Sequence, residues 1–128
     1  MILLDTHAWV WWCTGSPRLS NRASKAIHAG NIVGVSAISC WEVGMLVVKK
    51  RLVLDRDVEV WVDQALKLPK MQLLPLTPRI AVKSTRLGQE FHGDPVDRIL
   101  VATASEYGCP LISKDKRISE LHGLKVVW

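Results

Sequence analysis

Apolar and polar positions follow two kinds of pattern along the chain, short apolar runs and helical spacing, which predict strands and helices in turn. Short runs rich in β-branched or aliphatic residues predict strands at residues 1–5, 32–38, 72–76, 110–113 and 124–128. Helical spacing predicts helices at residues 7–12, 21–29, 41–50, 56–68, 78–87 and 95–107, and a short helical turn holding Ile118 and Leu121. Strands that alternate with helices indicate a three-layer α/β/α sandwich with a mainly parallel sheet of about five strands.

Several helix ends carry their own signals. N-caps are expected at Ser20, Asp55, Thr77 and Asp94, the last two followed by proline at the first helical position. Gly108 is expected to end the helix over 95–107. The 128 residues contain no repeats and fit a single domain over 1–128.

Composition narrows the class of protein. The chain is 48% hydrophobic and 23% charged, as in ordinary globular domains. No apolar run approaches the ~20 residues of a membrane span, and the N-terminus lacks a secretory signal pattern. Three cysteines without C-x-x-C spacing argue against a disulfide framework or a cysteine zinc site, and favour buried, reduced thiols. We therefore expect a cytoplasmic protein with no membrane association.

The charge balance points to an anionic partner. Lys plus Arg number 17 and Asp plus Glu 12, for a net charge of +5. This basic balance favours polyanions as ligands. If four of the 12 acids are gathered in one place, the remaining surface is more basic still, with 8 acids against 17 bases.

Acids occur where a parallel sheet would bring them together. Asp5 closes the first strand, Glu42 falls in the first turn expected after the second strand, and Asp115 follows the fourth. Carboxyl ends of strands and the N-termini of the helices that follow share one edge of the sheet. Asp94 and Asp97 join them, because their helix runs antiparallel to the strands.

Clustered carboxylates favour a metal ion. They repel one another and become protonated unless a cation is present. Oxygen ligands without matching His or Cys suit Mg²⁺ or Mn²⁺, which can activate water and neutralise a phosphate. A basic surface around such a pocket suits hydrolysis of a nucleic acid. We expect Asp5, Asp97 and Asp115 to ligate the metal, and Glu42 to ligate it or orient the water.

Each acid also has a local explanation. Asp5 could cap the first helix, and residues 39–42 fit the S-x-x-E capping box, which makes Glu42 the least secure member. Asp94 is most simply an N-cap. Asp97 fits a first-turn acid favoured by the helix dipole, and Asp115 an ordinary turn residue.

Neighbouring residues supply further candidates. Thr6 could cap the first helix or bond a metal-bound water, as an auxiliary residue. The candidates for contact with the nucleic acid are His92, Arg98, Lys49, Lys50 and Arg51, and Arg98 could instead balance the acids.

These motifs in this order resemble the PIN-domain ribonucleases, and most closely the VapC-type toxins of type II toxin–antitoxin systems. The resemblance is carried by residues 3–8, 35–42, 92–98, 111–115 and 126–128. It implies a PIN-like fold and a Mg²⁺-dependent endoribonuclease of the bacterial cytoplasm. The acids of its site would be Asp5, Glu42, Asp97 and Asp115, with Asp94 in an auxiliary role. It also implies a homodimer and a small antitoxin that plugs the acidic cleft. The helices at 41–50 and 56–68 would then line the dimer and the RNA groove, although residues 44–48 are more apolar than such a groove suggests.

Three other functions are weighed against this one. A receiver-like signalling module also has an acidic Mg²⁺ pocket, but it needs a phospho-accepting Asp at the end of its third strand, and residues 74–77 contain no acid. A PIN domain that binds RNA without cutting it would not need the four intact acids. A haloacid-dehalogenase-type phosphatase needs an Asp where His7 stands.

Overall fold

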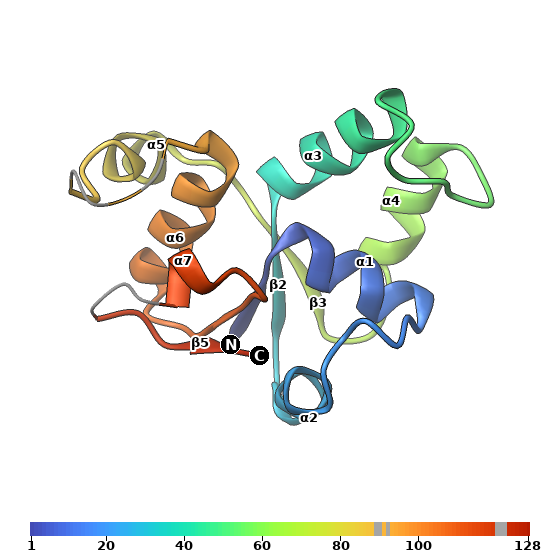
Figure 1. The fold of residues 1–128 in the computed structure, drawn as a ribbon, viewed down its shortest axis with the longest axis horizontal. Helices are drawn as coiled ribbons and strands as arrows, with labels where there is room; N and C mark the ends of the chain where they lie inside the picture. The colour runs from blue at the N-terminus through green and yellow to red at the C-terminus, as the bar shows by residue number, and fades with distance from the viewer. Residues whose placement is uncertain (89–90, 92, 120–122) are drawn as a thin grey trace.

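The computed structural model describes residues 1–88, 91, 93–119 and 123–128 (Figure 1). The strands are β1 Ile2–Leu4, β2 Val33–Ser36, β3 Met71–Leu74, β4 Leu111–Ile112 and β5 Val126–Val127. The helices are α1 Thr6–Thr14, α2 Asn21–Ala29, α3 Ala37–Val48, α4 Val58–Leu66, α5 Pro78–Ser84, α6 Pro95–Tyr107 and α7 Lys116–Ser119. The alternation predicted from the apolar pattern is confirmed.

All five strands form one parallel sheet in the order β3-β2-β1-β4-β5. Leu4 of β1 pairs with Val35 on one side and Ile112 on the other. The chain thus moves outward from β1 through β2 and β3, then returns to β4 beside β1. This reversal is a topological switch point, where α/β folds bind ligands. The order also differs from the 2-1-3-4-5 order of receiver domains, so the receiver alternative does not fit.

Helices cover both faces of the sheet, as Figure 1 shows, with α5, α6 and α7 on one side and α1, α2 and α4 on the other. Consecutive residues of β1 point to opposite faces, and both Leu3 and Leu4 are fully buried. Leu4 packs in a cluster with Trp9 of α1, whereas Leu3 packs with Leu100 of α6. The two faces of β1 therefore explain why its run is continuously apolar.

Most predicted helix ends are confirmed. Ser20, Thr77 and Asp94 are N-caps whose side chains accept backbone N–H groups, and Gly108 ends α6 with a positive φ of 61°. Asp55 is wrong as a cap, because the side chain of Asp57 accepts the Glu59 N–H and α4 begins at Val58. Leu121, expected in the last helical turn, lies outside the described residues.

The start of α3 differs most from the sequence prediction. The strand was expected to reach residue 38, but the backbone turns helical at Ala37 and Ser36 is the N-cap. The Ser36 hydroxyl accepts the Ile38 N–H at 3.2 Å. A β-branched run does not by itself mark where a strand gives way to a helix, because a serine cap overrides it.

The prediction of buried, reduced thiols is confirmed in part. All three cysteines are free thiols, but only Cys109 is buried, while Cys13 and Cys40 are half-buried. Within the described residues, no helix has the length and apolar character that crossing a membrane requires.

Candidate active site

A cavity of about 480 Å³ opens at the carboxyl edge of the sheet, beside the β1–β4 switch point. Five carboxylates line it, contributed by Asp5, Glu42, Asp94, Asp97 and Asp115. They come from the end of β1, from α3, from the start of α6 and from the segment after β4. The structure thus brings together every acid that the sequence singled out.

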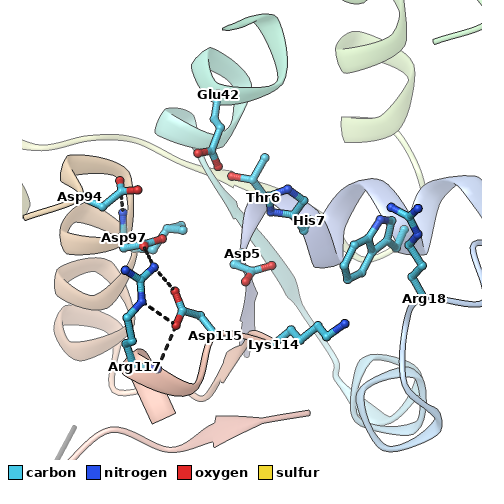
Figure 2. A pocket seen from close by; sticks show the side chains of 12 residues that line it. Asp5, Thr6, His7, Arg18, Glu42, Asp94, Asp97, Lys114, Asp115 and Arg117 are labelled. Atoms are coloured by element: carbon cyan, nitrogen blue, oxygen red, sulfur yellow. Dashed lines mark hydrogen bonds and ion pairs between the residues drawn. The ribbon is translucent and has the colours of Figure 1, made fainter. Parts of the chain in front are cut away.

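Asp5 lies at the centre of the cavity (Figure 2). Its backbone N–H still belongs to the sheet and donates to the Ile112 carbonyl at 3.0 Å. Its side chain is the N-cap of α1 and accepts the Ala8 N–H at 2.8 Å. Burial raises the pKa of Asp5, although hydrogen bonds from Ser113 and Ala8 oppose this. Capping and pocket lining are both observed for this acid.

Glu42 has no capping function. Since α3 starts at Ala37, Glu42 lies in the second turn of the helix, and the predicted S-x-x-E capping box is wrong. Ser39 is buried inside the first turn, where its hydroxyl accepts a hydrogen bond from Thr6 at 3.0 Å. Figure 2 shows the Glu42 carboxylate pointing toward Thr6 and the cavity. The local explanation that made this acid insecure is therefore removed.

Thr6 is buried, and it is the first residue of α1 rather than its cap. Its hydroxyl connects α1 to α3 through Ser39. This bond fixes the distance between the helix that carries the Asp5 cap and the helix that carries Glu42.

The N-terminus of α6 supplies two acids. Asp94 is the N-cap, and its Oδ1 accepts the Val96 N–H at 2.9 Å and the Asp97 N–H at 3.4 Å. Asp97 is half-buried, and its pKa is raised to about 7. Burial is the largest cause, followed by repulsion from Asp94, Asp115 and Glu42. The raised pKa is the electrostatic consequence of gathering the carboxylates.

Arg117 partly neutralises the cluster. Its Nη2 lies 2.8 Å from Asp115 Oδ2 and 3.9 Å from Asp97 Oδ2, and its Nε donates to Asp115 Oδ1 at 3.2 Å (Figure 2). The Arg117 side chain is 63% exposed. Sequence reasoning missed this residue. Its position two residues after Asp115, on the turn that becomes α7, was the available signal.

The donors fit a hard divalent cation in their chemistry, since all five are carboxylates. As placed, however, no three His, Cys, Asp or Glu side chains among the described residues are grouped closely enough to hold a metal ion. Asp97 and Asp115 share the Arg117 guanidinium instead. An ion bound by these acids would therefore compete with Arg117 for the carboxylates of Asp97 and Asp115.

Of the predicted RNA contacts that the structure describes, none lines this cavity. Lys49 and Arg51 line an adjoining groove beside Glu42 and Asp94, and the exposed Lys50 lines neither. His92 lies outside the described residues.

Arg98 points elsewhere. Its guanidinium donates to the Ser84 and Phe91 carbonyls at 3.2 Å each and lies over the Phe91 ring. Its expected role in balancing the acids or binding a phosphate is therefore not supported by its position, and it ties α6 to the end of α5.

A second wall of the cavity was not anticipated. It contains the cations Arg18 and Lys114 and the rings of His7 and Trp11. Lys114 directly precedes Asp115, which was a signal in the sequence. Arg18 follows a Gly-Ser-Pro break, and nothing local relates it to the acids.

Known proteins match this chain over nearly its full length. The PIN domain family matches residues 2–124. Ribonuclease VapC22 of Mycobacterium tuberculosis is 37% identical over 129 residues, covering 99% of this chain and 98% of that protein.

The fold is shared by solved structures of toxin–antitoxin complexes. A toxin–antitoxin complex from Klebsiella pneumoniae superposes with a TM-score of 0.70 at 24% identity, covering 97% of this chain and 95% of that one. VapBC2 from Rickettsia felis, bound to a DNA fragment from its promoter, superposes with a TM-score of 0.71 at 14% identity. This match covers 98% of this chain and 97% of that one. From the family match and the VapC22 identity together, the chain belongs to the PIN-domain family, and within it to the VapC-type proteins.

Proposed function

We propose that the protein is a metal-dependent endoribonuclease and the toxin of a toxin–antitoxin pair. The observation that carries this is the meeting of five carboxylates from four parts of the chain in one cavity at the switch point of the sheet. The name of the 37% identical relative, a ribonuclease, supports RNA as the substrate.

Each acid has a distinct role in the proposed reaction. Asp5, Asp97 and Asp115 would hold Mg²⁺ or Mn²⁺, and Glu42 would ligate the ion or orient the attacking water. Asp94 is auxiliary, because it caps α6 and fixes the backbone of Asp97. A bound ion would supply positive charge at the scissile phosphate and acidify a water molecule. The raised pKa of Asp97 supports this arrangement, since a nearby cation would favour the ionised carboxylate.

The test is RNA cleavage by the purified protein with Mg²⁺, with Mn²⁺ and with a chelator. We expect cleavage with either ion and none with the chelator. Asp5→Asn and Asp97→Asn are expected to lower the rate at least about a hundredfold, as is usual when charge stabilisation at a reacting group is lost. The matched control is Asp63→Asn, an exposed acid of α4 that pairs with Lys67.

Two outcomes contradict the proposal. Wild-type rates in either pocket variant would remove those acids from the reaction. Binding of RNA without cleavage by any form would instead favour the non-cleaving PIN alternative.

The partners follow from the same family. We propose that a small antitoxin binds the protein, in line with the toxin–antitoxin complexes that share its fold. We further propose a homodimer in the bacterial cytoplasm. We also propose a single domain over 1–128, supported by the single sheet that all five strands form.

A further inference from the structure

The wall of the cavity opposite the clustered acids is basic and aromatic. In Figure 2, Arg18 lies across Asp5 from Asp94, Asp97 and Arg117, and Lys114 extends toward the same side. Arg18 comes from the segment between α1 and α2, and Lys114 from the short segment between β4 and α7. Asp5 therefore stands between a negative half and a positive half of one cavity.

Arg18 and Lys114 have charge to offer a ligand. Both side chains are exposed, and in the described part of the chain neither forms an ion pair or a side-chain hydrogen bond. Arg117, the third cation of the cavity, differs because it is paired with Asp115. An anion bound on this wall would not have to displace a partner of Arg18 or Lys114.

Three aromatic rings pack against one another in a row that ends at this wall, with tilted contacts of 51° between His7 and Trp11 and 58° between Trp11 and Trp128. Trp11 lies 5.8 Å from Trp128 and 5.6 Å from His7, measured between ring centroids. Trp128 and Trp11 are half-buried, while His7 is exposed at the cavity. The supported His7 ring offers a surface on which a nucleic-acid base can stack.

We propose that this wall is the subsite for the nucleotide next to the scissile phosphate, with Arg18 and Lys114 binding a backbone phosphate of single-stranded RNA and His7 stacking on its base. The proposal rests on the endoribonuclease function proposed above. Its physical basis is charge complementarity, because an RNA strand is repelled by five carboxylates and needs cations beside them. The wall places those cations across Asp5 from the acid cluster.

The first test measures binding apart from cleavage. Anisotropy of a fluorescent single-stranded RNA is recorded with a chelator, over a range of salt concentrations. Arg18→Gln and Lys114→Gln are each expected to weaken binding about tenfold at low salt and to reduce the salt slope by about 1. Arg22→Gln and Lys25→Gln on α2 are matched controls, since both are exposed cations that do not line the cavity.

The second test separates binding from chemistry. In cleavage assays with Mg²⁺, the Arg18 and Lys114 variants should raise KM about tenfold and leave kcat within about twofold. His7→Ala should weaken RNA binding about tenfold, in line with the stacking of one base, and His7→Phe should restore it because a ring is returned. Failure of His7→Phe to restore binding would overturn the stacking assignment.

Other results would overturn the subsite. Equal losses in the α2 controls would mean that Arg18 and Lys114 act only through net charge. Losses confined to Lys49→Gln and Arg51→Gln would place the strand in the adjoining groove instead. If wild-type protein binds RNA through this wall but cleaves nothing, the phosphate and base contacts stand, while the proposed nuclease function and the place beside a scissile phosphate both fail.

Discussion

At the scale of single residues, the raised pKa of Asp97 shows that gathering the acids in the cavity destabilises its ionised form. Its pKa is about 7 in the folded protein, whereas in the unfolded chain it lacks both burial and acidic neighbours and has an ordinary value of about 4. Folding therefore favours protonation of this group. The ionised form of Asp97 therefore destabilises the folded state. The free energy of unfolding falls as the pH rises from about 4 to about 7 and stays lower above that pH.

Asp97→Asn should consequently stabilise the protein where wild-type Asp97 is ionised. Without divalent ions we expect a gain of about 1–2 kcal/mol in the free energy of unfolding at pH 8, which disappears near pH 4. Urea unfolding at both pH values measures it, with Asp63→Asn as the control. A variant less stable than wild type at pH 8 would contradict the proposed charge repulsion.

Arg117 should lower the pKa of Asp97. Its guanidinium lies 3.9 Å from the Asp97 carboxylate and lowers the pKa of that group against the other acids. In Arg117→Gln we expect the Asp97 midpoint to rise above its wild-type value of about 7, followed by carboxyl ¹³C NMR without divalent ions. Arg56→Gln removes a cation that pairs with Asp55 outside the cavity and should leave the midpoint unchanged. An unchanged midpoint in Arg117→Gln would show that the ion pair does not form in solution.

At the scale of elements, the β2–α3 junction determines how Glu42 is interpreted. Ser36 ends β2 and caps α3, so the helix begins at Ala37, two residues before Ser39. Ser39 is thereby free to accept the Thr6 hydrogen bond that joins α1 to α3. The Ser36 cap thus positions Glu42 over the cavity, and it excludes a capping role for Glu42.

Mutations at this junction can separate the two explanations. Ser36→Ala should lower the free energy of unfolding by about 1 kcal/mol, as loss of an N-cap usually does. Glu42→Ala should leave stability equal or greater, because Glu42 caps nothing and repels Asp97. Thermal unfolding of both variants, with Ser20→Ala on α2 as the reference cap, measures this. A loss of about 1 kcal/mol in Glu42→Ala would restore the capping box.

At the scale of the whole molecule, exposed apolar side chains gather on the α3–α4 hairpin. Val48 at the end of α3 is 73% exposed, and Val53 in the following connection is 90% exposed. Apolar residues exposed together are typical of surfaces that bind another protein. This is the region in which the family resemblance predicts a dimer interface.

If the hairpin forms that interface, a charge there should dissociate the dimer. We expect the double variant Val48→Asp, Val53→Asp to be monomeric at micromolar concentration, while Val82→Asp on α5 stays dimeric. Light scattering after size exclusion gives the mass of each. A monomeric wild-type protein, or a double variant that remains dimeric, would contradict a dimer through this hairpin.

The local sequence determined the elements and the identity of the acids. Apolar periodicity and caps such as Asp94 act within a few residues, so they predicted α6 closely and placed Asp5 and Asp115 at strand ends. Parallel strands then required these acids to share an edge. The sequence therefore predicted that Asp5 would meet the other acids.

Only the tertiary structure decided which cations face those acids. Arg98 adjoins Asp97 in sequence, yet its guanidinium turns to the backbone of α5, while Arg18 reaches the cavity from a distant segment. The orientation of a long, flexible cation depends on which neighbours the fold supplies, and those lie far away in the chain. The same holds for the strand order. Pairing β4 beside β1 makes β1 the central strand, whose two faces are buried, and no local pattern encodes that choice.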